Sequence, residues 1–122
     1  MKLLIAGSRS LANQRSAVRE AIFRSPWLDE GEPSGVDKII AGGADGVDTF
    51  AIQIAEELAL DTEVHEPLWE DWGPAAGPKR NTDMVEAADA ILIVWDGNSD
   101  GSADTLRKAI DSGKPLYVEQ LD

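Results

Sequence analysis

The stretch KLLIAGSR, residues Lys2–Arg9, decides the fold, because a nearly continuous apolar run ends abruptly in a small polar turn. Consecutive apolar residues are typical of a strand that is covered on both faces of a parallel sheet. Similar runs and shorter strand patterns recur along the chain. Strands are expected at Lys2–Ala6, Val36–Ala41, Thr62–Glu66, Ala90–Asp96 and Leu116–Glu119.

Helix-period patterns lie between these runs. In the clearest, apolar side chains recur from Val47 to Leu58 at the spacing of one helix face. Ser112-Gly113 followed by Pro115 indicates the end of another helix. Alternating strands and helices imply βαβ units. We therefore expect one Rossmann-like α/β domain over residues 1–122, a three-layer sandwich with a mainly parallel sheet of about five strands.

Composition excludes several classes of protein. The 122 residues include 11 Lys and Arg against 23 Asp and Glu, a net charge of −12, which disfavours unaided binding to nucleic acid or anionic membranes. Without cysteine there is no disulfide, thiol nucleophile or Cys-ligated zinc. No apolar run approaches the about 20 residues of a membrane span, and the polar turn follows the start too closely for a signal peptide. A cytoplasmic protein is expected, whose acidity reflects either salt adaptation, as in halophiles, or an ordinary acidic surface.

Three glycine-rich loops follow predicted strands, where open α/β sheets bind ligands. They are Gly7–Ser10, Gly42–Asp48 and Asp96–Ser102. Small residues there let backbone N–H groups approach an anion such as phosphate, although neither a P-loop nor a dinucleotide fingerprint is present. The candidate ligand-binding residues from these loops are Gly7, Ser8, Arg9, Gly42, Gly43, Ala44, Gly46, Asp48, Gly97, Ser99, Gly101 and Ser102.

The segment Pro67–Pro78 is rich in Trp, Gly and Pro and leads into the basic pair Lys79-Arg80. Trp69 and Trp72 are candidates for a wall that stacks on a base, and Trp72 is assigned to the site. Arg80, placed near the start of a helix, either holds a phosphate or pairs with a surface carboxylate. His65, the only histidine, has no partners at ligand spacing and is interpreted as structural.

Together these segments resemble the YspA-like (cpYpsA-related) branch of the SLOG superfamily, which includes the Lonely Guy phosphoribohydrolases and the DNA-processing protein Smf/DprA. The resemblance covers Met1 to about Val118 and implies a Rossmann-like domain that binds nucleotides or nucleotide-derived ligands. It also implies a phage or conflict-system context and a possible homodimer. The ordered motifs that carry it are Gly7-Ser8-Arg9, Gly42–Asp48, Asp71-Trp72, Ala76–Asn81 with Met84, and Gly97-x-Ser99-x-Gly101.

The hydrolase relatives carry two motifs, one of which is degraded here. Arg80 and Met84 match their R-K-x-x-M helix, with Asn81 in place of Lys. The second motif is P-G-G-x-G-T, followed by a Glu. Here Gly101-Ser102 replaces its Gly-Thr, and the preceding Pro-Gly-Gly is missing. Thr105 stands where the relatives have the Glu. Asp104 is adjacent but shorter. The missing carboxylate would stabilise an oxocarbenium-like state, so its loss favours binding over catalysis.

Three functions are therefore consistent with the sequence. The first is a sensor or accessory domain that binds a small nucleotide-like ligand. The second is a nucleoside-monophosphate phosphoribohydrolase, an N-glycosidase in which Arg80 positions the phosphate and Asp104 replaces the missing Glu. The third is a protein–protein adaptor with a vestigial pocket. No metal site and no certain cofactor are predicted, and Mg²⁺ enters only as a companion of a bound phosphate.

Overall fold

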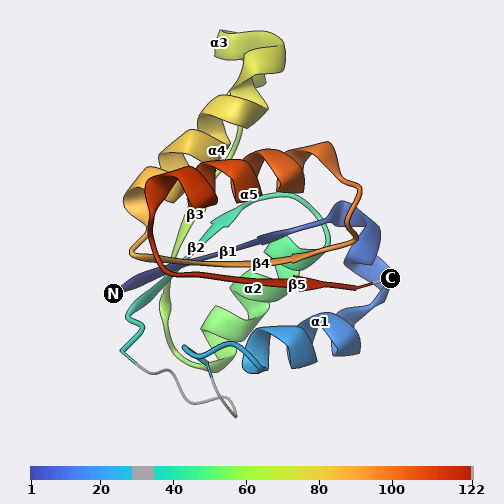
Figure 1. Ribbon diagram of the computed structural model, residues 1–122, viewed down its shortest axis with the longest axis vertical. Helices are drawn as coiled ribbons and strands as arrows, with labels where there is room; N and C mark the ends of the chain where they lie inside the picture. The colour runs from blue at the N-terminus through green and yellow to red at the C-terminus, as the bar shows by residue number, and fades with distance from the viewer. Residues whose placement is uncertain (29–34, 122) are drawn as a thin grey trace.

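The structure, a computed structural model, describes residues 1–28 and 35–121. In this part of the chain five parallel strands form one sheet in the order β3-β2-β1-β4-β5 (Figure 1). The expected α/β sandwich with a parallel sheet is confirmed. The strands are β1 (Lys2–Gly7), β2 (Lys38–Gly42), β3 (Asp61–His65), β4 (Ala90–Trp95) and β5 (Leu116–Gln120).

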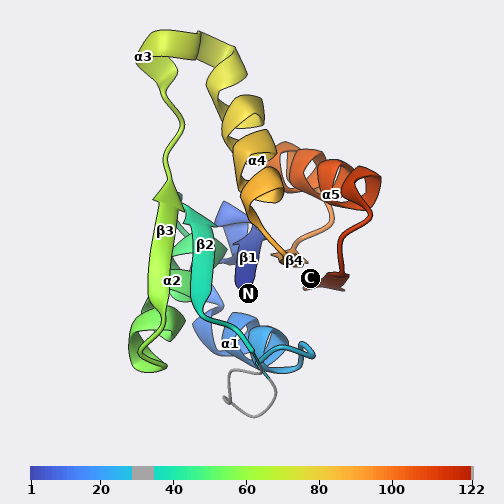
Figure 2. The ribbon, with the colours of Figure 1, turned by 90° about the vertical axis from the view of Figure 1, so that its left-hand side faces the viewer.

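Helices cover both faces of the sheet (Figure 1). One face carries α1 (Arg15–Phe23), preceded by the 3₁₀ turn η1 (Arg9–Asn13), and α2 (Val47–Glu57). The other carries α4 (Ala76–Ala87) and α5 (Asp100–Ser112). Between β3 and α4, the short α3 (Trp69–Trp72) and η3 (Gly73–Ala75) project beyond the end of the sheet as an arm (Figure 2).

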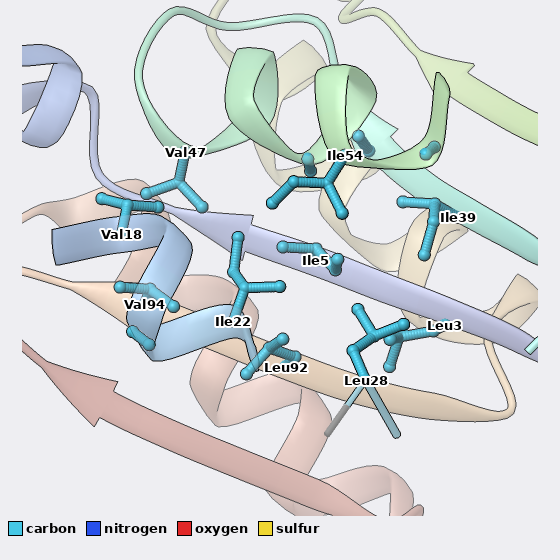
Figure 3. Close-up of a cluster of buried hydrophobic side chains, with 14 of the residues drawn as sticks. Leu3, Ile5, Val18, Ile22, Leu28, Ile39, Val47, Ile54, Leu92 and Val94 are labelled. Carbon is cyan, nitrogen blue, oxygen red and sulfur yellow. The ribbon is translucent and has the colours of Figure 1, made fainter. Parts of the chain in front are cut away.

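The apolar run of β1 divides its side chains between two cores, because alternate residues of a strand point to opposite faces. Leu3 and Ile5 pack toward α1 and α2 (Figure 3). Leu4 and Ala6 pack toward α4 and α5. A central strand between two helix layers therefore needs apolar residues at every position, which explains the unbroken run.

Some expected boundaries are wrong. The second strand begins at Lys38 and not at Val36, which is buried but precedes the strand. The two Pro and two Gly of Ser25–Gly35 predict an exposed excursion before the second strand, yet Ser25 and Leu28 are fully buried; residues 29–34 lie outside the described residues.

The strand order places a topological switch point beside β1. The chain builds β2 and β3 on one side of β1 and then returns to its other side to form β4. Connections leave β1 and β4 toward opposite faces, so a crevice opens beyond their carboxyl ends, where Gly7 pairs in register with Val94. The fold itself therefore determines where a ligand site can form.

Candidate functional site

A cleft with a volume of about 420 Å³ occupies this switch point. Such a volume lies within the range of small-ligand sites, roughly 300–1,000 Å³. Its walls come from the ends of β1 and β4, the loop before α2, the first turns of α4 and α5, and the arm. The lining residues are Ala6, Gly7, Ser8, Arg9, Ser10, Ala44, Asp48, Trp69, Gly77, Pro78, Arg80, Asn81, Met84, Asp96, Ser99, Asp100, Gly101, Ser102, Asp104 and Thr105.

The structure brings most of the candidate residues together and leaves some outside. Those that line the cleft are Gly7, Ser8, Arg9, Ala44, Asp48, Arg80, Asn81, Ser99, Gly101, Ser102 and Asp104. Gly42 lies behind the lining, against Arg80 and Asp48. Four other candidates lie outside the lining. A side chain on Gly43 would meet Glu66, one on Gly46 would meet the backbone of Ser8 and Arg9, and one on Gly97 would meet Gln120. Trp72 is half-exposed on the arm.

Arg80 projects from the second turn of α4 into the cleft. The helix begins at Ala76, so the expectation that Arg80 stands near its start is wrong by one turn. Its Nε donates to Asn81 Oδ1 (3.0 Å) and its Nη1 to the His65 carbonyl oxygen (3.3 Å). Nη2 has no hydrogen-bond partner among the described residues. Burial lowers the pKa of Arg80 from its ordinary value, partly offset by the Asp48 charge.

Arg80 and Arg9 differ from most cations of this acidic chain. Among the described residues, neither forms an ion pair within 4.0 Å. Their charges are close enough that Arg9 contributes to lowering the pKa of Arg80. The cations that do form ion pairs with side-chain carboxylates are Lys2, Arg19, Arg24, Lys38, Lys79, Arg107 and Lys108. Two arginines without a direct ion-pair partner among the described residues therefore face one cleft, whose lining also includes Asp48, Asp96, Asp100 and Asp104.

Asp48 is the buried carboxylate of the cleft, in the first turn of α2. Its Oδ2 accepts a hydrogen bond from the Ala44 amide (3.2 Å). Burial raises the pKa of Asp48 to about 6, although the Ala44 amide and the charges of Arg80 and Arg9 act in the opposite direction. The group therefore changes charge near neutral pH beside the two arginines.

Neighbouring residues of α4 have separate roles. Lys79 turns away from the cleft, paired with Asp83 (3.2 Å) and 5.2 Å from the centre of the Trp72 ring. Asn81 is buried and links the two helices, accepting from Arg80 and donating through Nδ2 to Asp104 Oδ2 (3.0 Å). The basic pair seen in the sequence thus supplies only one cation to the cleft, and Asn81 orients it.

Asp104 is engaged by the protein itself. Its carboxylate accepts hydrogen bonds from Lys108 Nζ (2.7 Å), Arg107 Nη2 (2.9 Å) and Asn81. Burial raises the pKa of Asp104, but the hydrogen bonds from Lys108 and Asn81 outweigh it, so the net shift is downward. A carboxylate held ionised by two cations is a poor proton donor.

Ser8 and Asp96 tie the ends of β1 and β4 together. Ser8 Oγ accepts from the Asp96 amide (3.1 Å) and lies 2.8 Å from Ser99 Oγ. Ser10 Oγ donates to Asp96 Oδ2 (2.6 Å), and the Asn98 and Ser99 amides donate to Oδ1. These hydrogen bonds lower the pKa of Asp96 to about 2, and the bond from Ser10 has the largest effect. The Ser8 hydroxyl thus shapes the loop.

The start of α5 opens into the cleft. The first amide to bond within this helix is Ala103, which donates to the Ser99 carbonyl (3.0 Å). Asp100, Gly101 and Ser102 precede it and line the cleft. Helix N-termini offer unpaired N–H groups and the positive end of the helix dipole.

The candidate set omitted several lining residues. Ser10 and Asp96 follow β1 and β4, so the strand-end rule could have added them. Gly77 and Met84 share a helix face with the candidate Asn81 at i, i+4 and i+7, so this periodicity could have added them. Trp69 and Trp72 are both candidates for an aromatic wall, and no sequence feature indicates which of them lines the cleft.

Two kinds of feature are absent from the part of the chain that the structure describes. No helix there is long and apolar enough to cross a membrane. No group of three or more His, Asp or Glu side chains in the same residues gathers closely enough to hold a metal ion.

The fold and the cleft define a class: three-layer α/β proteins with a parallel Rossmann-like sheet and a cleft at its carboxyl edge. The chain is 32% identical to the Gene 61 protein of Mycobacterium phage D29 over 124 residues, covering 94% of this chain and 93% of the phage protein. It belongs to the family of that phage protein. No protein-family model and no solved structure matches the chain.

Proposed function

We propose that this protein binds a nucleotide or a nucleotide-derived ligand in the cleft, with a phosphate group at Arg80, and serves as a sensor or accessory protein. One observation carries the proposal: a partly buried guanidinium without an ion-pair partner among the described residues faces a cleft in a chain of net charge −12. Guanidinium offers paired donors that match phosphate oxygens. A cation left unpaired among so many carboxylates is suited to an anion from outside the chain.

Neighbouring groups support the same assignment. Arg9 adds a second positive charge, and the first turn of α5 lines the same space with Gly101 and Ser102. Phosphate commonly binds where a helix N-terminus and a basic side chain meet. Unaided binding of long nucleic acids stays disfavoured, because the rest of the surface is acidic.

We further propose membership of the YspA-like branch of the SLOG superfamily. Four of the five segments that carry the resemblance contribute residues to one cleft, and Asp71-Trp72 lies outside its lining. The four are Gly7–Arg9, Gly42–Asp48, Ala76–Asn81 with Met84, and Gly97–Gly101. The phage origin of the related protein agrees with the context that the resemblance implies.

Binding is favoured over hydrolysis of an N-glycosidic bond. The residue at the catalytic Glu position is Thr105, whose hydroxyl donates to the Gly101 carbonyl (3.2 Å). Asp104 is neutralised by Lys108 and Arg107. Thr105 carries no carboxylate, and the carboxylate of Asp104, although it lines the cleft, is already paired with two cations.

Titration calorimetry with nucleoside 5′-monophosphates and the corresponding nucleosides tests the proposal. The monophosphates should bind more tightly than the nucleosides, and the difference should shrink as salt screens the arginines. No free base should appear on prolonged incubation; release of base would favour the phosphoribohydrolase. If no nucleotide binds or raises the melting temperature, the proposal is overturned in favour of the adaptor.

Gly42→Ala should weaken monophosphate binding while the domain stays folded. A methyl group on Gly42 would stand 2.5 Å from Arg80 Nη1 and 2.9 Å from Asp48 Oδ2, so the guanidinium must move. Loss of one charge-assisted hydrogen bond corresponds to a decrease of about tenfold in affinity. The neighbouring Gly43 would not have this effect, because a side chain there would meet Glu66 and not the guanidinium.

A double-mutant cycle supplies the control for Gly42. In an Arg80→Ala background the added methyl group has no guanidinium to displace, so Gly42→Ala should change affinity little further. Equal losses in both backgrounds would mean that Gly42 acts on the loop and not through Arg80.

A further inference from the structure

We infer that Trp69 is the residue by which the cleft selects a planar heteroaromatic base, so that its ligands are nucleotides and not bare sugar phosphates. The inference rests on the proposed function and adds to it the residue that sets ligand class. The arm of α3 and η3 projects beyond the sheet (Figure 2). It contains no buried residue. Trp69 and Trp72 are 54% and 50% exposed there.

Only one of these two similar side chains lines the cleft. Trp69 is part of its wall, whereas Trp72 lies outside the lining with Lys79 5.2 Å from its ring centre. A large apolar ring left half in water gains stability when another flat ring covers it. Trp69 therefore presents an open aromatic surface at the site, and Trp72 does not.

Glycine on α4 brings the indole close to the helix that carries Arg80. A methyl group built on Gly77 would be 3.5 Å from Trp69 Cη2, so the ring lies against the first turn of α4. Gly77 and Arg80 are three residues apart and share one helix face. The aromatic wall and the guanidinium thus lie about one turn apart along the helix.

This arrangement gives the cleft two chemically different ends. Trp69, Gly77 and Pro78 form an apolar end, and Arg80 with the start of α5 forms an anion-binding end. A base joined to a phosphate through a pentose has matching groups in the same order. Ribose 5-phosphate would satisfy only the second end.

Calorimetry with adenosine, guanosine, cytidine and uridine 5′-monophosphates and with ribose 5-phosphate tests the inference. Stacking of a base on an aromatic side chain corresponds to roughly tenfold in affinity or more. Trp69→Ala should therefore weaken binding of the monophosphates about tenfold and leave ribose 5-phosphate unchanged. Trp69→Phe keeps a ring and should retain most of the affinity.

Trp72→Ala is the matched control, since it removes an equally exposed indole from the same helix. It should leave every affinity unchanged. Bound monophosphate should quench tryptophan fluorescence in the wild type and in Trp72→Ala, and the quenching should largely disappear in Trp69→Phe.

The outcomes separate the inference from the proposed function. If Trp69→Ala binds the monophosphates as tightly as the wild type while Arg80→Ala does not, the inference is wrong and the phosphate site stands. The same applies if ribose 5-phosphate and the monophosphates weaken equally in Trp69→Ala. If none of the four monophosphates binds the wild-type protein, the proposed function is overturned and the inference with it.

Discussion

Arg80→Ala should weaken the binding of a nucleoside monophosphate by roughly ten- to a hundredfold, because charge-assisted hydrogen bonds contribute about 1.5–3 kcal/mol. The guanidinium faces the cleft without an ion-pair partner within 4.0 Å among the described residues, so its removal breaks no direct ion pair, although the buried Asp48 loses a neighbouring positive charge. Arg80→Lys should recover only part of the loss, since an ammonium lacks paired donors. Affinities from titration calorimetry measure the effect, and the affinity for the unphosphorylated nucleoside should hardly change.

Lys79→Ala provides a control of equal charge change on the same helix. Lys79 is paired with Asp83 outside the cleft, so its removal should change affinity only slightly. If Arg80→Ala weakens nucleoside and nucleotide equally, Arg80 shapes the pocket and is not the phosphate anchor.

Asp48→Asn should stabilise the protein at pH 8 but hardly at pH 4. Burial raises the pKa of Asp48 from 3.8 to about 6, so the fold favours the protonated form. The stability that the protonated Asp48 carboxyl contributes is fully present below about pH 4 and is lost as the pH rises through 6. Two pKa units correspond to roughly 3 kcal/mol. This is the upper bound on how far Asp48→Asn raises the free energy of unfolding at pH 8. Urea denaturation at pH 4, 6 and 8 measures it.

Asp45→Asn is the matched control, because Asp45 is exposed in the loop just before α2. It should show no such pH-dependent gain. A uniform loss of stability in Asp48→Asn at every pH would indicate a hydrogen bond to the carboxylate that an amide cannot replace. A carboxylate that costs stability beside two arginines is typical of a functional site, and Asp48→Asn should strengthen phosphate binding above pH 6.

Much of the fold was predictable because burial leaves a periodic record in the sequence. β1, β2 and β4 are central strands and appear as apolar runs. The edge strands β3 and β5 are more exposed and gave weaker patterns. Boundaries were less predictable: Val36 is buried without belonging to β2, because an apolar pattern records burial and not the strand's hydrogen bonds.

Part of the candidate site was also predictable. Parallel strands bring their carboxyl ends to one edge, so the turns at Gly7, Ala44 and Gly101 could be placed together without coordinates. The orientation of each residue within those turns could not. Gly42 and Gly43 are neighbours, yet one abuts Arg80 and the other, with φ +95°, faces Glu66.

The sequence alone determined the layered parallel sheet, the edge at which a ligand can bind and the acidic surface around it, because these depend on residue type and short-range spacing. Only the tertiary structure decided that Arg80 enters the cleft while Lys79 turns to Asp83, that Asp104 is held by Lys108, and that Trp69 rather than Trp72 lines the wall. Adjacent residues on a helix point about 100° apart. Which of them meets the cleft therefore depends on how α3 and α4 pack against β1 and α5, contacts between residues far apart in the chain.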